Sequence, residues 1–188
     1  MGISTINPFG FETVSVDIDF VTSTSSNVII PISRNMREVV RGRLYIDEDP
    51  GSAFSAWATY TFYCKAAMHG ADAFFRTDAK LVYTELKVAT TGSGTVIVPD
   101  DHTDFNPNDL ALILASGNNE FVRLKNIAST MIAEDTVGIH NIDDGFVRVS
   151  EFSGFSLFNN ENEDDVYLNV RFAVAQTVSL KMEMLLRK

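Results

Sequence analysis

The chain has 188 residues, of which 45% are hydrophobic and 11% aromatic, so it can bury a core of its own, and disorder over most of its length is excluded. Its single cysteine excludes an intrachain disulfide and a zinc site built on paired thiolates. The formal net charge of −10 is concentrated between residues 100 and 165, where 14 acidic side chains stand against 3 basic ones. A negative field of this kind disfavours binding to nucleic acid.

No targeting or membrane segment is expected. The N-terminal residues lack a basic segment followed by an apolar run, so no signal peptide is predicted. No stretch approaches the roughly 18 uninterrupted apolar residues that a membrane-spanning helix needs. The single cysteine fits a protein made in a reducing cytoplasm.

The first quarter of the chain predicts strands separated by polar segments. Residues 1–11 are expected to form an N-terminal arm, because proline and glycine interrupt regular structure there. Apolar and polar residues alternate over 12–20, as in a half-buried strand. The polar stretch 22–27 is expected to be a loop before a short strand at 28–32. Residues 34–46 fit either one helical turn or the start of a strand.

The middle of the chain contains its most apolar segment. Residues 54–67 are apolar on both faces, which is typical of a strand at the centre of a packed structure or at an interface. Residues 70–88 fit a helix in their first part, and a strand is favoured from Lys80 onward. A short strand at 96–98 and an acidic loop at 100–109 follow.

Residues 110–151 are predicted to form two β-hairpins in succession. Each joins apolar runs through a turn rich in Asn, Asp and Gly, which accept positive φ or hydrogen-bond their own backbone. The first runs from 110–114 to 121–125 and the second from 137–139 to 146–149. Both return with the tripeptide Phe-Val-Arg, 25 residues apart.

Two final strands, at 166–174 and 178–186, follow a polar loop at 159–165. Roughly a dozen short strands and no long amphipathic helix predict an all-β fold with at most one or two short helices. The expected architecture is an antiparallel β-sandwich, with a jelly roll as one arrangement, that forms a single domain over residues 12–188.

Two acidic loops contain candidate cation ligands. Asp104, Asn106 and Asn108 place oxygen atoms at alternate positions, as a calcium loop does, but the glycine and glutamate that complete that pattern are missing. A solvated turn is the alternative. Asp164 and Asp165 end the second loop, where closely spaced like charges usually stay in water. No cofactor is predicted.

No catalytic constellation is apparent in the sequence. His69, His102 and His140 are scattered, and only His102 has acidic neighbours along the chain. Cys64 lies in an apolar run, as expected of a buried side chain rather than a nucleophile. A phosphate-binding glycine loop and the serine elbow of hydrolases are both missing. We therefore expect a protein that is not an enzyme.

Arg34, Arg37, Arg41 and Arg43 form the one basic cluster of the sequence. A nucleic-acid patch is normally larger and lies on a basic background, so an interface with an acidic neighbour is the favoured interpretation. In a self-assembling protein this cluster could meet the acidic region 100–165 of the next copy, which is a heterologous contact.

The loose arm, the two hairpins with their repeated Phe-Val-Arg, the single cysteine and the missing catalytic signature resemble the small all-β structural proteins of tailed bacteriophage particles, such as capsid decoration, tail or baseplate subunits. The resemblance covers the whole chain as architecture and carries no functional residue across. It implies a non-enzymatic virion subunit, made in the host cytoplasm, that forms homo-oligomers or docks on another virion protein.

A carbohydrate-binding β-sandwich is the alternative. Exposed aromatic side chains such as Trp57, Tyr60 or Tyr83 would stack on the rings of a glycan, and an acidic loop could hold calcium. The two hypotheses differ in what the surface should offer. A virion subunit should leave the strand at 54–67 or the N-terminal arm bare, whereas burial of all these aromatic side chains in the core would remove the basis of the glycan hypothesis.

Overall fold

The computed structural model describes residues 3–6, 10–32, 36–66, 70–128, 130–157 and 165–188, and for 3–6, 64–66 and 70–74 it describes the backbone alone. The described residues form strands and turns and contain no helix, so they include no helix that could cross a membrane. The predicted all-β, antiparallel fold is confirmed. The strands are β1 (Ile3–Ile6), β2 (Phe11–Ile30), β3 (Glu38–Ile46), β4 (Phe54–Ala66), β5 (Gly70–Glu85), β6 (Val96–Ile97), β7 (Leu110–Leu114), β8 (Glu120–Ile127), β9 (Met131–Ala133), β10 (Gly145–Ser156) and β11 (Val166–Arg187).

Strand pairing places β4 between β11 and β5, in agreement with the central position predicted for a strand that is apolar on both faces. Because β3 pairs with both β10 and β11, the strands β3, β11, β4, β5 and β10 close a barrel. Contacts group the chain into two compact units. Unit 1 comprises Met1–Leu44, Trp57–Ala79 and Glu151–Lys188, and unit 2 comprises Tyr45–Ala56 and Lys80–Ser150.

The predicted arm, 1–11, contains β1, which pairs with β2 from Ile3–Ser15 to Ile6–Glu12. Contacts divide the chain into two compact units, and the single domain over 12–188 stays a prediction. An alternating pattern identifies the apolar face of a strand, but it cannot tell which of two cores that face joins.

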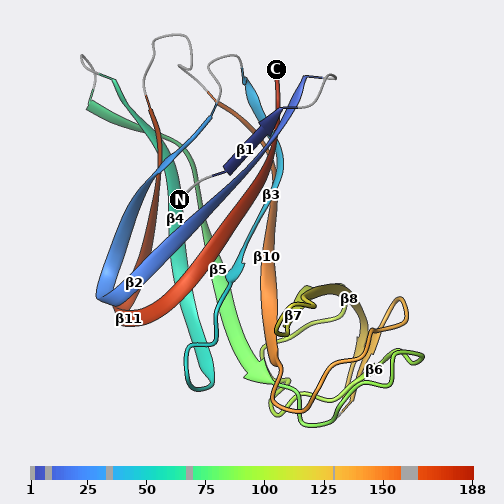
Figure 1. The fold of residues 1–188 in the computed structure, drawn as a ribbon. Helices are drawn as coiled ribbons and strands as arrows, with labels where there is room; N and C mark the ends of the chain where they lie inside the picture. The colour runs from blue at the N-terminus through green and yellow to red at the C-terminus, as the bar shows by residue number, and fades with distance from the viewer. Residues whose placement is uncertain (1–2, 7–9, 33–35, 67–69, 129, 158–164) are drawn as a thin grey trace. The chain divides into compact units, whose positions relative to one another are not determined.

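Unit 1 is built around β2 and β11, which pair antiparallel over nearly their whole length. Figure 1 shows both strands bending at the same place, where the register shifts on either side of Gln176. The polar stretch 22–27, predicted as a loop, is therefore part of β2. Its three serines and Asn27 pair with β11, because the ladder partner, more than local polarity, decides strand formation.

An aromatic cluster lies in the interior of unit 1. Phe62 is fully buried, with its ring centroid 4.9 Å from that of Phe155 and 5.8 Å from that of Phe152. Gly42 on β3 leaves room for this cluster, because a Cβ at that position would lie 2.2 Å from the ring of Phe152. The cluster consists of Tyr60, Phe62, Phe75, Phe152 and Phe155.

Unit 2 continues the pairing through short strands. The order runs from β5 through β10, β7, β8 and β9 to β6, and a bridge between Leu86 and Pro99 returns it to the end of β5. Figure 1 shows these strands curling around a common interior. Most of the buried side chains there are aliphatic: Val82, Leu86, Ile97, Phe105, Ala111, Ile113, Val122, Leu124, Met131, Ala133, Val137 and Phe146.

The first predicted hairpin is confirmed, since β7 and β8 pair from Leu110–Arg123 to Ile113–Glu120. The second is wrong. Residues 146–149 lie in β10, which pairs with β7 and β5, and residues 137–139 form no strand. The turn at 143–145 reverses the chain as expected, but the returning strand finds its partners elsewhere in the sequence.

Candidate functional site

The acidic loop at 100–109 is held by bonds to its own unit. The Asp104 carboxylate accepts a hydrogen bond from Ser55 Oγ at 2.6 Å and lies 3.4 Å from Lys80 Nζ. The backbone N–H of Asn106 donates to the loop's last aspartate at 2.8 Å. The carbonyl of Asn108, a residue with a φ of 71°, accepts a hydrogen bond from an arginine of β8 at 2.8 Å. These contacts order the loop.

Several other predicted residues are only partly described. Asp164, His69 and the side chain of Cys64 lie outside the described residues, and Asp165 is exposed next to the start of β11. Within the ranges that the structure describes, no three His, Cys, Asp or Glu side chains are grouped so that they could hold a metal ion. Calcium binding stays a prediction of the sequence.

The basic cluster lies in unit 1, along β3 and the residues before it. Arg34 lies outside the described residues, whereas Arg37 and Arg41 are exposed. Arg43 forms an ion pair with Glu183 of β11 at 2.5 Å. The structure therefore places two of the four predicted interface arginines on the surface of unit 1.

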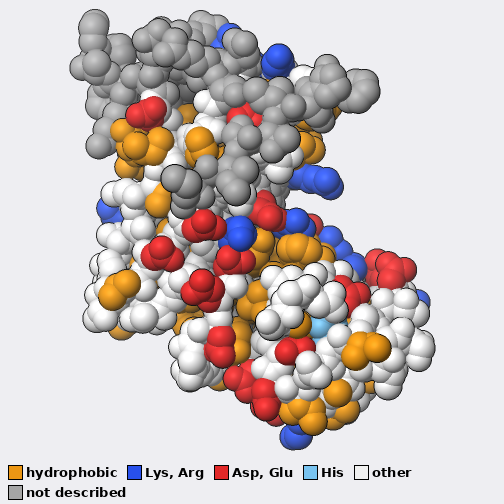
Figure 2. All heavy atoms as spheres, in the orientation of Figure 1, with side chains coloured by type: hydrophobic (Ala, Val, Ile, Leu, Met, Phe, Trp, Pro, Cys, Tyr) orange, Lys and Arg blue, Asp and Glu red, His pale blue; other side chains and the backbone are white. Residues whose placement is uncertain are grey.

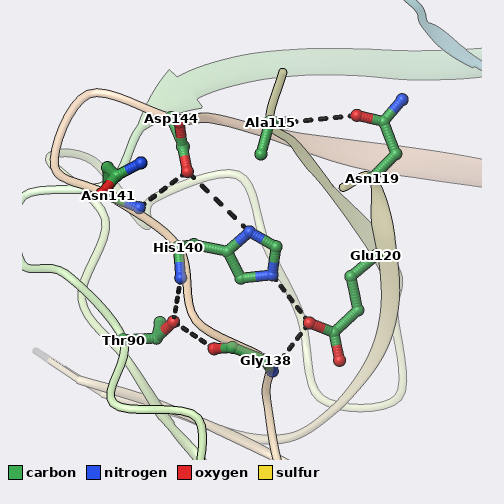
Figure 3. A network of polar contacts seen from close by, with 8 residues as sticks. All are labelled: Thr90, Ala115, Asn119, Glu120, Gly138, His140, Asn141 and Asp144. Carbon is green, nitrogen blue, oxygen red and sulfur yellow. Dashed lines mark hydrogen bonds and ion pairs between the residues drawn. The ribbon is translucent and has the colours of Figure 1, made fainter. Parts of the chain in front are cut away.

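A buried polar cluster in unit 2 surrounds His140 (Figure 3). The imidazole Nε2 lies 2.7 Å from Glu120 Oε2, and Nδ1 lies 3.8 Å from Asp144 Oδ2. Glu120 also accepts a hydrogen bond from the backbone N–H of Gly138 at 2.8 Å. The Thr90 hydroxyl donates to the carbonyl of Gly138 and accepts from the N–H of His140 at 2.8 Å. Side chains thus satisfy the backbone N–H groups of Gly138 and His140, a role that a neighbouring strand fills in a regular ladder.

The His140 imidazole is enclosed within unit 2, since its side chain is 0% exposed. Among the described residues its Nδ1 has no hydrogen-bond partner, because the carboxylate at 3.8 Å is beyond hydrogen-bond distance. The sequence draws attention to His102 instead. In the sequence, the one hint of the His140 cluster is that Asp144 follows His140 by four residues. The other partner, Glu120, is 20 residues away and gives no local signal.

The three aromatic side chains expected to bind a glycan differ in exposure. Trp57 is 62% exposed, but Tyr60 and Tyr83 are 1% and 2% exposed, so the expectation fails for the two tyrosines. Burial, followed by a hydrogen bond to the Asp49 carboxylate, raises the pKa of the Tyr83 hydroxyl well above its ordinary value. Trp57 alone remains available as a platform.

Trp57 borders a surface hollow of about 360 Å³ in unit 1. The hollow is formed by three strands, which contribute Trp57 and Thr59 from β4, Asp78 from β5, and Arg171, Phe172 and Ala173 from β11. Thr59 Oγ1 donates a hydrogen bond to Asp78 Oδ1 at 2.5 Å. Arg171 is exposed and lies opposite Thr59 in the ladder between β11 and β4.

The hollow belongs to a larger surface, which we call the outer face. Its side chains alternate with buried ones such as Phe62 and Val170, so all point away from the interior. Strand register aligns them in three rows across β2, β11 and β4: Ser25, Arg171 and Thr59; Asn27, Asn169 and Thr61; and Ile29, Tyr167 and Tyr63.

Polar and aromatic contacts order the far end of the outer face. The rings of Tyr63 and Tyr167 stack at 5.3 Å with an interplanar angle of 20°. Asn169 Nδ2 donates to Asn27 Oδ1 at 2.6 Å, and the Tyr63 hydroxyl reaches the same oxygen at 3.4 Å. An indole at one end and a tyrosine pair at the other thus border rows of hydroxyl and amide groups.

Comparison with models of known protein families found no match, and neither the curated proteins nor the solved structures gave one. Functional inference for this chain therefore depends on the geometry of its own surfaces.

Proposed function

We propose that the protein is a non-enzymatic structural subunit of a virus-like particle, and that it acts by self-assembly or by docking on another particle protein. The observation that carries the proposal is an exposed apolar surface on unit 2 that consists of Val88, Ile139 and Ile142, which are 50%, 71% and 56% exposed. We call it the unit 2 apolar surface.

Backbone hydrogen bonds bring these three side chains to neighbouring segments. The N–H of Thr90 donates to the carbonyl of His140 at 3.0 Å, and the N–H of Asp143 donates to the carbonyl of Leu86 at 2.9 Å. Residues 86–90 and 140–143 therefore run side by side. Apolar side chains gathered in this way favour burial against another protein, whereas single exposed ones need no explanation.

Charge segregation supports a contact between copies. Unit 2 contains 13 acidic and 5 basic residues, and Figure 2 shows acidic and apolar side chains close together on its visible face. Unit 1 contains 12 acidic and 10 basic residues, with Arg37 and Arg41 exposed on and next to β3. Exposed arginines of unit 1 on one copy and the acidic unit 2 of the next suit a head-to-tail assembly, in which opposite charges steer association and fix orientation.

The experiment is sedimentation velocity over a range of micromolar concentrations, with the double variant Ile139→Ser/Ile142→Ser. The wild-type chain should form larger species as its concentration rises, and the variant should stay monomeric, because burial of its apolar side chains no longer favours association. Added salt should weaken the association if charge contributes.

The matched control is Val21→Ser/Val174→Ser, which removes two exposed apolar side chains of unit 1. This variant should associate like the wild-type chain. A strict monomer at micromolar concentration that also fails to bind any particle surface would overturn the proposal.

Carbohydrate binding is the second candidate function, and the hollow beside Trp57 favours it. An exposed indole next to hydroxyl, carboxylate and guanidinium groups is an arrangement that suits a sugar ring, whose C–H groups stack on the indole while its hydroxyls find polar partners. Saturable binding of a glycan that depends on Trp57 would support this function.

A further inference from the structure

We infer that the outer face of unit 1 binds an oligosaccharide that carries a carboxylate, with one sugar ring on Trp57 and the carboxylate on Arg171. The inference rests on the second candidate function and makes it specific, since it names both the ligand class and the residue that selects it. It involves only β2, β4, β5 and β11 of unit 1.

Trp57 supplies the stacking platform. Its side chain is 62% exposed at the rim of a hollow, so one face of a pyranose ring can lie against the indole. The electron-rich face of an indole attracts the partly positive C–H groups of the sugar. Burial of apolar area on both partners adds to the affinity.

Arg171 supplies the preference for an anion. Its guanidinium lines the same hollow as Trp57, and in the described part of the chain it forms no ion pair. The one carboxylate that lines the hollow, Asp78, accepts a hydrogen bond from Thr59. A guanidinium forms two parallel hydrogen bonds with a carboxylate, which a neutral hydroxyl cannot reproduce. A uronic or sialic acid meets this requirement.

The length of the outer face suits a chain of sugars rather than a single ring. Trp57 and Tyr63 are six residues apart on β4, which corresponds to about 20 Å at the rise of a β-strand. Between them lie the amides of Asn27 and Asn169 and the hydroxyl of Thr61. Such groups hydrogen-bond sugar hydroxyls, whereas the buried centre of a protein interface is typically richer in apolar side chains.

Trp57 is the sole tryptophan of the chain, so its fluorescence reports on this site directly. The experiment titrates the full chain with a short oligogalacturonate and with the same oligosaccharide after methyl esterification, which removes the charge alone. Sialyllactose against lactose forms a second pair and distinguishes sialic from uronic acid. We expect a saturable change in emission, with the acidic ligand of at least one pair bound about tenfold more tightly than its neutral counterpart, a difference of about 1.4 kcal/mol.

Arg171→Gln should remove this preference, so that the acidic and neutral ligands bind alike. Arg41→Gln is the matched control, because it removes an exposed arginine of the same unit on another strand and should leave the preference unchanged. Trp57→Ala should abolish binding of every ligand in calorimetry, with the circular dichroism spectrum retained.

The outcomes distinguish a failure of this inference from a failure of the proposed glycan binding. Equal affinity of the wild-type chain for both members of each pair would overturn the role of Arg171 and leave glycan binding in place. No binding by a folded chain would overturn glycan binding as well. Binding that survives Trp57→Ala would show that the site lies elsewhere and overturn the inference.

Discussion

Unit 1 and unit 2 are both built from antiparallel strands, but different interactions determine their shapes. Unit 1 contains strands of 20 and 22 residues and an aromatic cluster, so long ladders satisfy its backbone and contacts between rings pack part of its interior. In unit 2 the strands β6 to β9 have between 2 and 8 residues, and side chains such as Glu120 and Thr90 bond the backbone between them. Unit 1 should therefore be sensitive to changes in packing, and unit 2 to the loss of buried polar contacts.

The largest effect is expected from Phe62→Ala. This ring is fully buried at the centre of the aromatic cluster, so its removal leaves a cavity that the neighbouring rings cannot fill. The free energy of unfolding should fall by about 3 to 5 kcal/mol in urea denaturation. Hydrogen exchange, read residue by residue, should show the loss of protection mainly in unit 1.

Phe121→Ala is the control for this variant, because Phe121 is an aromatic residue of unit 2 that is 37% exposed. Its removal should cost about 1 kcal/mol, in line with its smaller buried area. Equal losses for the two variants would mean that the buried ring of Phe62 contributes no more to stability than a partly exposed ring.

Gly42→Ala tests how tightly the aromatic cluster is packed. The new methyl group would lie 2.2 to 2.9 Å from three atoms of the Phe152 ring, and that ring is enclosed by other aromatic side chains. We expect a loss of about 1 to 3 kcal/mol by overpacking in thermal and urea unfolding. Adding Phe152→Leu to the Gly42→Ala variant should restore part of the lost stability.

Gly94→Ala is the matched control in unit 2. The added methyl group would meet only the Thr91 hydroxyl, at the ordinary contact distance of 3.6 Å. Its effect should stay within about 0.5 kcal/mol. If Gly94→Ala lost as much stability as Gly42→Ala, the cost of both substitutions would come from the lost backbone freedom of glycine and not from contact with the Phe152 ring.

His140→Phe tests the polar cluster of unit 2. The variant keeps a ring of similar size but removes the contact between Nε2 and Glu120, so a partly buried carboxylate loses one of its two partners and keeps the N–H of Gly138. Unfolding should become easier by about 1 to 3 kcal/mol. The amide protons of Gly138 and His140 should exchange faster, because their acceptors Glu120 and Thr90 are no longer held in place.

His102→Phe is the control, since His102 is only half-buried and lies in the acidic loop. Its effect should be within about 0.5 kcal/mol. If the two histidine variants were equally stable, the His140 cluster would not be what orders the segment before β10.

Local patterns in the sequence predicted most strands, and they failed wherever a distant partner decides the outcome. Alternation over 12–20 and the polar turn after 110–114 are local signals, and both gave the observed structure. Residues 22–27 were expected to be a loop, because nothing in their composition reveals the ladder with β11. The turn at 143–145 likewise signals a reversal but not the pairing of β10 with β7 and β5.

The candidate sites were harder to predict, because burial and convergence are properties of the folded chain. Trp57, Tyr60 and Tyr83 have similar apolar neighbours in sequence, but only the indole lies at the surface. Glu120 and His140 are brought together across 20 residues by the curl of unit 2. Arg171 lies far from the basic cluster that the sequence singled out, and it is strand register that places it opposite Thr59.

The smallest effect is expected from Tyr83→Phe in unit 2, and it depends on pH. Burial and the Asp49 carboxylate raise the pKa of the Tyr83 hydroxyl in the folded chain, so folding favours its protonated form. That contribution is fully present below the unfolded pKa of about 10 and is lost as the pH rises above it.

At neutral pH the Tyr83→Phe variant should lose about 1 kcal/mol of stability with the hydrogen bond to Asp49. Between about pH 10 and 12 it should lose less stability than the wild-type chain as the pH rises. Urea denaturation at several alkaline pH values measures the difference, and parallel loss in the two chains would mean that Tyr83 ionises freely in folded unit 2.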